Sequence, residues 1–209
     1  MIIDQAQLLI FIPAALALNL TPGSDMLFCL GQGLKSGPKE GIAASLGIAT
    51  GSIIHILMAG LGLAALLASS PLAFEVIRWV GVSYLVWLAL QAYRNPISTV
   101  QAREAKTRSV FKAWRQGMLV NLLNPKVIVF ILAFIPQFVD PTRGSVFLQF
   151  LIFGAVLNVG GTIINGLVGT FSGKIGKTLA ANGKLARIFQ WFTSAVFIGL
   201  AAKLAFDRR

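Results

Sequence analysis

The sequence predicts an all-α integral membrane protein with six transmembrane helices, arranged as two inverted three-helix repeats whose first helices are broken. Three observations predict it: an apolar composition, long runs almost without charge, and motifs that recur in the same order in both halves. Hydrophobic residues make up 56% of the 209 residues and charged residues only 12%, with a mean hydropathy of +0.78. Soluble domains are about 45–50% apolar and about 25% charged. This chain therefore has too little polar surface to cover a soluble core.

Six apolar runs give the predicted spans, because a spanning helix needs about 20 mostly apolar residues. The first run is expected to be retained, since it lacks the basic start and the small-residue cleavage site of a signal peptide. A turn at 69–71 ends the second run, and Glu75 and Arg78 can pair before the third. The third and sixth runs are short unless flanking basic side chains extend towards the membrane surface. In chain order the runs are 5–24, 41–74, 79–93, 116–139, 144–173 and 188–202.

Basic residues alternate between the connections and so predict the orientation. Segments 31–40, 94–115 and 172–187 hold two, six and four basic residues, whereas 69–71 and 137–144 hold none and one. Cytoplasmic loops of membrane proteins are enriched in Lys and Arg. The first, third and fifth connections are therefore expected in the cytoplasm and both termini outside, although three basic residues near the C-terminus favour the opposite side for that end. We expect 94–115 to orient the protein rather than to act in transport.

Two matched motifs and one matched tryptophan predict the repeat. Three spans in each half give the halves opposite orientations in the membrane, and inverted repeats of this kind are typical of transporters. The chain is then a single transporter domain over 1–209, with repeat one at 1–93, a cytoplasmic linker at 94–115 and repeat two at 116–209. The aligned segments are Asn19-Leu20-Thr21-Pro22-Gly23 with Leu122-Leu123-Asn124-Pro125-Lys126, Gly51-Ser52-Ile53-Ile54-His55 with Gly161-Thr162-Ile163-Ile164-Asn165, and Trp79 with Trp191.

The segment around Pro22 predicts a break in the first span. Proline removes a helical hydrogen bond and the following Gly23 adds backbone freedom. We expect a second half-helix with Thr21 as its N-cap and Pro22 as its first residue. Asp25 follows at once, and a carboxylate within the membrane typically marks a substrate or proton path. Two alternatives stay open: a proline kink that only shapes packing, and an Asp25 that only complements the helix dipole.

The segment around Pro125 predicts a matching break in the fourth span. Asn124 and Pro125 are expected as N-cap and first residue. Lys126 then carries a positive charge at the positive end of the helix dipole. An anion beside it, either Asp25 or a substrate carboxylate, would explain this position. The alternative places Lys126 at the inner membrane surface.

We expect the two breaks to face each other across a pseudo-two-fold axis, with the substrate between them. His55, Asn158 and Asn165 lie on neighbouring spans, where hydrogen bonds between helices are the favoured role and pore lining the alternative. The Gly47–Gly51 and Gly160–Gly161 pairs are expected to allow close helix packing. The candidate substrate-binding residues are Asn19, Thr21, Pro22, Gly23, Asp25, Asn121, Asn124, Pro125 and Lys126, and Asp25 is also the candidate for proton coupling.

Other functional classes find little support in the sequence. One histidine, His55, and one cysteine, Cys29, cannot form a His/Cys metal cluster. Serine-hydrolase, metalloprotease and phosphate-loop motifs are absent, so we expect neither an enzyme nor a cofactor. The net charge is +11. The basic residues that cause it lie between the apolar runs, where membrane topology places them, so no nucleic-acid partner is expected.

The Asn-x-Thr-Pro-Gly-x-Asp stretch at 19–25, Asn124-Pro125-Lys126, the basic central connection and the chain length together resemble the LysE/RhtB family of bacterial amino-acid exporters. The resemblance covers essentially the whole chain. The family usually has Thr-Pro-Gly-Pro-Asp, and here Ser24 replaces the second proline.

This resemblance implies export of amino acids or close derivatives across the bacterial cytoplasmic (inner) membrane, coupled to the proton gradient. The implied partners are an amino-acid substrate, protons and the lipid bilayer, with no cofactor. Family membership does not fix the substrate and leaves a homo-oligomer open. The alternatives are an ion or metal exporter of related architecture, and an uptake carrier, because the sequence does not show the direction of flux.

Overall fold

The computed structural model describes residues 2–69, 71–94, 109–175 and 183–206, and this part of the chain is helical and without strands, as predicted. Short 3-10 and π-helical turns (η) accompany the α-helices. The elements are α1 (Gln5–Leu20), α2 (Ser24–Ser36), α3 (Pro38–Ser69), α4 (Pro71–Arg94), α5 (Val110–Leu122), α6 (Pro125–Val129), η1 (Phe130–Phe134), η2 (Ile135–Phe138), η3 (Pro141–Arg143), α7 (Val146–Thr170) and α9 (Gly183–Phe206).

Both predicted breaks are present. The chain bends by 50° between α1 and α2, and by 53° between α5 and the segment from Pro125 to Phe138. Among the described residues, α3 and α7 are long and apolar enough to cross a membrane, and the number rises to four if each bent pair is one span. The chain is thus a helical integral membrane protein, and the six-span inverted repeat stays a prediction.

The cap at the second break is confirmed. The Asn124 side chain accepts a hydrogen bond from the Lys126 N–H at 3.0 Å, and Pro125 begins α6.

The predictions that Thr21 caps the second half-helix and that Pro22 is its first residue are wrong, because Thr21 is the C-cap of α1 and α2 begins only at Ser24, with Gly23 as its N-cap. The Thr21 backbone N–H still donates to Ala17 O at 3.1 Å, and its hydroxyl donates to the same oxygen at 2.8 Å. These bonds hold Thr21 on the preceding helix. The first bent pair also runs to Ser36, well past the predicted limit at 24.

Glycines allow the long helices to pack closely around α3. A Cβ built on Gly47 would overlap the carbonyl oxygen of Trp114, and one on Gly41 would lie 2.7 Å from the carbonyl oxygen of Gly169. The Ser45 hydroxyl on α3 donates to Thr162 O on α7 at 2.8 Å. Thus α5 and α7 both lie directly against α3, and the expected packing role of Gly47 is confirmed.

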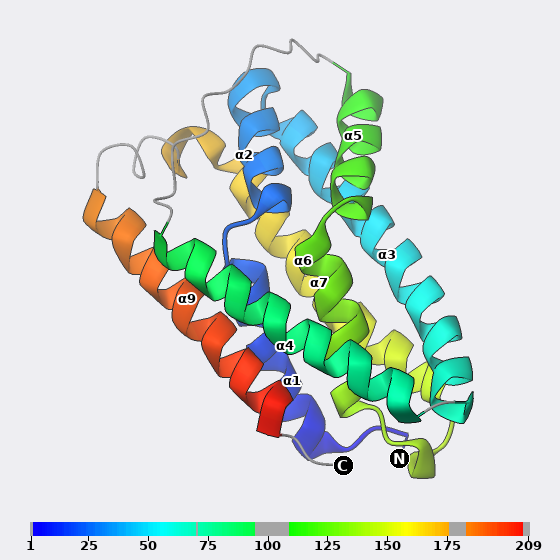
Figure 1. Cartoon of the computed structure of the whole chain (residues 1–209). Coiled ribbons are helices and arrows are strands. Elements are labelled where there is room, and N and C mark those ends of the chain that lie inside the picture. Colours follow the sequence, from blue (N-terminus) through cyan, green and yellow to red (C-terminus); the bar gives the residue numbers. More distant parts are fainter. Residues whose placement is uncertain (1, 70, 95–108, 176–182, 207–209) are drawn as a thin grey trace.

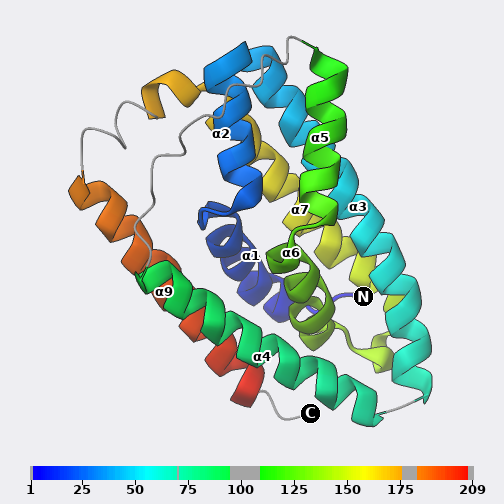
Figure 2. The ribbon, with the colours of Figure 1, turned by 45° about the horizontal axis from the view of Figure 1, so that its top comes forward.

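The helix bundle has two opposite ends, shown in Figure 1. At one, which we call the α2–α3 end, lie the α2–α3 connection, the start of α5 and the end of α7. The opposite α3–α4 end holds the N-terminus, the junction between α3 and α4, and the end of α9. Helices α4 and α9 pack side by side along one flank of the bundle (Figure 2). The predicted Glu75–Arg78 pair is confirmed at 3.0 Å.

Candidate functional site

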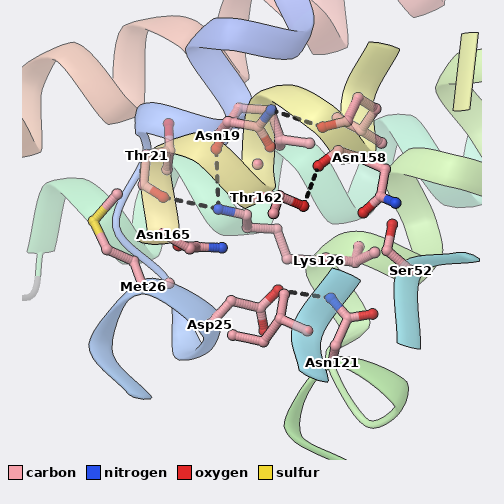
Figure 3. A pocket seen from close by; sticks show the side chains of 16 residues that line it. Asn19, Thr21, Asp25, Met26, Ser52, Asn121, Lys126, Asn158, Thr162 and Asn165 are labelled. Atoms are coloured by element: carbon pink, nitrogen blue, oxygen red, sulfur yellow. Dashed lines mark hydrogen bonds between the residues drawn. The ribbon is translucent and has the colours of Figure 1, made fainter. Parts of the chain in front are cut away.

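The two helix breaks meet inside the bundle, and Asp25 is the first link between them. It lies in the first turn of α2, 9% exposed. One carboxylate oxygen accepts a hydrogen bond from Asn121 Nδ2 and the other from Asn124 Nδ2, each at 2.8 Å. Both asparagines belong to the second break, so the carboxylate of one break is held by the amides of the other (Figure 3 shows Asn121).

Lys126 makes the reciprocal link. Its ammonium group donates to Thr21 O at 2.9 Å and to Leu18 O at 3.2 Å. These carbonyls lie at the C-terminal end of α1, where a helix carries partial negative charge and unpaired acceptors. Gly23 leaves room for the ammonium group, since a Cβ there would lie 3.2 Å from Nζ. Lys126 is thus hydrogen-bonded to backbone carbonyls rather than ion-paired with Asp25.

A cavity of about 50 Å³ lies between the breaks. One water needs about 10–15 Å³ in such a cavity, so this space has room for a few waters and is too small for an amino acid. Charged and polar side chains from both breaks and from α3 and α7 converge on it (Figure 3). The lining residues are Leu18, Asn19, Thr21, Gly23, Asp25, Met26, Ile48, Ser52, Asn121, Lys126, Val127, Leu157, Asn158, Gly161, Thr162 and Asn165.

The structure brings most of the candidate residues to this cavity. Pro22 and Pro125 are not among the lining residues; they lie within the breaks themselves. Asn124 also lies outside the lining, and contacts the site through Asp25. The candidates that line the cavity are Asn19, Thr21, Gly23, Asp25, Asn121 and Lys126.

Four polar lining residues were not among the candidate substrate-binding residues, although pore lining was the alternative for Asn158 and Asn165: Ser52, Asn158, Thr162 and Asn165. The second matched motif contained a signal for three of them, because it aligns Ser52 with Thr162 and ends on Asn165. Its glycines explain the contact: Gly51 faces Asn121 Oδ1 and Gly161 faces Asn19 Oδ1, and a Cβ would come within 2.9 and 3.1 Å.

Asn121 has one side-chain atom with no partner. Its Nδ2 donates to Asp25, but its Oδ1 is buried and accepts no hydrogen bond. An unsatisfied buried acceptor costs about 1–3 kcal/mol. His55 lies close by, with Nε2 3.3 Å from the backbone oxygen of Asn121, which confirms its expected role in a hydrogen bond between helices. The cavity therefore offers an acceptor to a ligand donor.

Comparison with known proteins gives a match along nearly the whole chain. The family model described as LysE type translocator matches residues 16–208. An uncharacterized membrane protein of Vibrio cholerae is 33% identical over 198 residues, covering 94% of this chain and 95% of its own. No solved structure matches the chain.

Two named relatives are efflux proteins. The homoserine/homoserine lactone efflux protein of Salmonella typhi is 32% identical, over 91% of this chain and 92% of its own. The leucine efflux protein of an Enterobacter species is 29% identical over 93% of each chain.

Proposed function

The chain belongs to the LysE type translocator family, and from this premise we propose that it exports amino acids or close derivatives through the cavity between its two helix breaks. Membership of a transporter family makes the chain a transporter rather than an enzyme. The similarity to efflux proteins for homoserine and leucine supports an amino-acid substrate. The proposed location is the bacterial cytoplasmic membrane.

One observation carries the proposal: a carboxylate and an ammonium group from opposite breaks line the same small cavity. An amino acid carries both charges, in the complementary sense. Its ammonium group would bind Asp25 and the free acceptor Asn121 Oδ1, and its carboxylate would bind Lys126. Charges attract each other far more strongly in such a water-poor site than in water. Broken helices near the membrane midplane are also where transporters bind substrates.

Binding requires the breaks to move apart, because the cavity of about 50 Å³ cannot hold an amino acid. Lys126 would exchange its bonds to the Leu18 and Thr21 carbonyls for bonds to the substrate carboxylate. The end of α1 would thereby lose its partner when the substrate binds. Substrate binding is in this way coupled to the position of α1, which is what alternating access needs.

We further propose that proton antiport drives export, with Asp25 as the carrier. The sequence contains no nucleotide-binding motif, so an ion gradient is the natural source of energy. A proton taken up from outside would neutralise Asp25 and weaken its hold on the substrate ammonium. Loss of that proton to the cytoplasm would restore the carboxylate for the next substrate.

The alternative of an ion or metal exporter has less support. The two efflux relatives are named for organic substrates. The polar groups of the cavity are amides and hydroxyls, with one carboxylate and one ammonium group. A lysine beside the carboxylate would repel a metal ion.

Counterflow in proteoliposomes tests the proposal. Vesicles preloaded with one unlabelled amino acid should accumulate the same labelled amino acid for at least one member of a panel that includes homoserine and leucine. Zinc and manganese ions should give none. The variants Asp25→Asn and Lys126→Gln should lose counterflow, and Lys35→Gln, an exposed control at the end of α2, should keep it. Counterflow of a metal ion without any amino acid would contradict the proposal.

A further inference from the structure

Buried polar residues continue beyond the cavity on α2, towards the α2–α3 end. Asp25, Cys29 and Gln32 follow one another at spacings of four and three, so they share one face of the helix. Each is at most 9% exposed. On α7, Asn165 lines the cavity and Ser172 follows seven residues later, just past the helix end; they are 8% and 3% exposed. Helices α2 and α7 are in contact.

Gln32 indicates that this face serves a ligand rather than the fold alone. Its Oε1 is buried and accepts no hydrogen bond. Gln149, buried at the other end of α7, differs: its Oε1 accepts from Asp140 N at 2.8 Å and its Nε2 donates to Asp140 O at 2.7 Å. A buried acceptor left unpaired is costly unless something transiently binds it. Water or an ammonium group passing along α2 would do so.

Backbone contacts between glycines close this face in the structure. A Cβ built on Gly33 would overlap Gly169 O and lie 2.6 Å from Ser172 Oγ. A Cβ on Gly169 would come within 2.7 Å of the Gly41 carbonyl carbon. The start of α3 and the ends of α2 and α7 thus meet without side chains between them. A contact of this kind separates without unpacking a large core.

The other side of the cavity is closed by aromatic side chains. Five phenylalanines, all fully buried, lie in successive ring contacts with centroids 4.5 to 6.5 Å apart. They come from α1, the segment after the second break, and α7. This cluster consists of Phe11, Phe130, Phe134, Phe138 and Phe153. Opening it would expose far more apolar surface than parting the glycines.

We infer that substrate enters the cavity from the α2–α3 end, along the facing sides of α2 and α7, and that the contact of Gly33, Gly41 and Gly169 is the gate of this passage. The inference rests on the proposed transport function for the identity of the substrate. It adds the route, the gate and a role for Gln32 as a hydrogen-bond acceptor on the way.

Cys29 reports on the passage directly, because it is the only cysteine of the chain and is fully buried one turn from Asp25. The protein is reconstituted in vesicles of known orientation and treated with an impermeant, positively charged methanethiosulfonate reagent from either side. A Lys35→Cys variant in a Cys29→Ser background marks the side of the α2–α3 end. We expect Cys29 to react from that side only. An Ala113→Cys variant in the same background, equally buried but on α5, should not react.

Substitution of the gate glycine sharpens the test. Gly33→Ala should raise the rate of Cys29 modification about tenfold, equivalent to about 1.4 kcal/mol, because the added Cβ prevents full closure. Gly31→Ala is the matched control on the same helix, with no atom within 4 Å of its Cβ, and should leave the rate unchanged. An equal effect of both variants would overturn the assignment of the gate.

The outcomes separate the passage from the function. Reaction of Cys29 only from the opposite side, or from neither side, overturns the passage whatever the protein transports. Counterflow without such reaction leaves the proposed function intact. Reaction of Cys29 from the α2–α3 end in a protein that gives no amino-acid counterflow supports the passage and contradicts the function.

Discussion

At the scale of single residues, Asp25 and Lys126 each lie at one break and form their hydrogen bonds with the other. Asp25 follows the first break and is held by Asn121 and Asn124 of the second. Lys126 follows the second break and holds the α1 carbonyls before the first. Neither break can therefore change shape without changing the partners of the other.

Asp25→Asn should abolish proton-coupled export and leave a folded, membrane-inserted protein. Asparagine has the size of aspartate and keeps one acceptor for the amides of Asn121 and Asn124. Unlike a carboxylate, it cannot take up and release a proton. The measurement is export of labelled amino acid against its gradient under an imposed pH difference, beside counterflow at equal pH. Export at a rate near that of the unsubstituted protein would make Asp25 structural.

Lys126→Met should lower stability as well as abolish substrate binding. The variant keeps most of the length of the side chain but removes the ammonium donor from Leu18 O and Thr21 O; Leu18 O still accepts from the Thr21 N–H at 3.2 Å, whereas Thr21 O loses its side-chain donor. Unsatisfied buried acceptors cost about 1–3 kcal/mol. Thermal unfolding in detergent should show a lower midpoint than for the exposed control Lys35→Met. Equal midpoints for the two variants would mean that water replaces the ammonium group and that Lys126 does not stabilise α1.

At the scale of elements, local chemistry predicted one break better than the other. Asn124-Pro125 is a strong start signal, and α6 begins there. At the first break the same reasoning placed the cap on Thr21, but the hydroxyl turns back to Ala17 O. Threonine can either cap the next helix or bond within the preceding one, and its neighbours in the sequence do not decide between the two.

Contacts across the bundle could not be predicted from the sequence, for a different reason. The proline positions and the polar residues around them marked the site, and most of the candidates do line the cavity. That Lys126 bonds to carbonyls of α1 depends on how α1 and α6 approach in space, more than 100 positions apart in the chain. The π-helical turn η1 likewise has no reliable local signal.

The loop before α7 should contribute stability that is independent of pH in the physiological range. Asp140 accepts hydrogen bonds from the hydroxyl and the backbone N–H of Thr142 and pairs with Arg143 at 3.3 Å. The Thr142 hydroxyl is the main cause that lowers the pKa of Asp140 below its usual 3.8. A lowered carboxyl pKa stabilises the folded state above the unfolded pKa, and this is lost as pH falls through the folded value.

The destabilisation caused by Asp140→Asn, measured by thermal unfolding, should therefore be the same at about pH 6 and about pH 8, and should shrink only below about pH 4. A pH dependence of export between those two values then has its origin in a group other than Asp140. A destabilisation that changed between about pH 6 and about pH 8 would contradict this assignment.

At the scale of the whole molecule, the matched motifs meet in corresponding ways. Gly51 on α3 faces Asn121 before the second break, and Gly161 on α7 faces Asn19 before the first. The third helix of each predicted repeat, α4 and α9, packs against the other. These correspondences are what an inverted repeat requires, and they support it as a proposal. Composition and periodicity alone could not have indicated which helices pair.

The last prediction concerns the orientation in the membrane. It can be tested at defined positions because the basic connections lie together at one end of the molecule. Segment 31–40, the start of α5 and the end of α7 lie together at the α2–α3 end, although the chain separates them widely. They lie in or next to the three connections with two, six and four basic residues, whose other described parts are Arg94 at the end of α4 and residues 183–187 at the start of α9. Most of the 94–115 connection, including the three basic residues Arg103, Lys106 and Arg108, lies outside the described residues.

Because basic loops stay in the cytoplasm, we expect the α2–α3 end to face inward and η3 to face outward. In a Cys29→Ser background, Lys35→Cys should react with an impermeant thiol reagent only in inside-out vesicles. Thr142→Cys, at an exposed position within η3, should react in intact cells. A Gln101→Cys variant extends the test to the central connection and should behave as Lys35→Cys does. Labelling of Lys35→Cys in intact cells would show that the topology is the reverse of the expected one. The proposed passage along α2 and α7 would then open to the outside and serve substrate release.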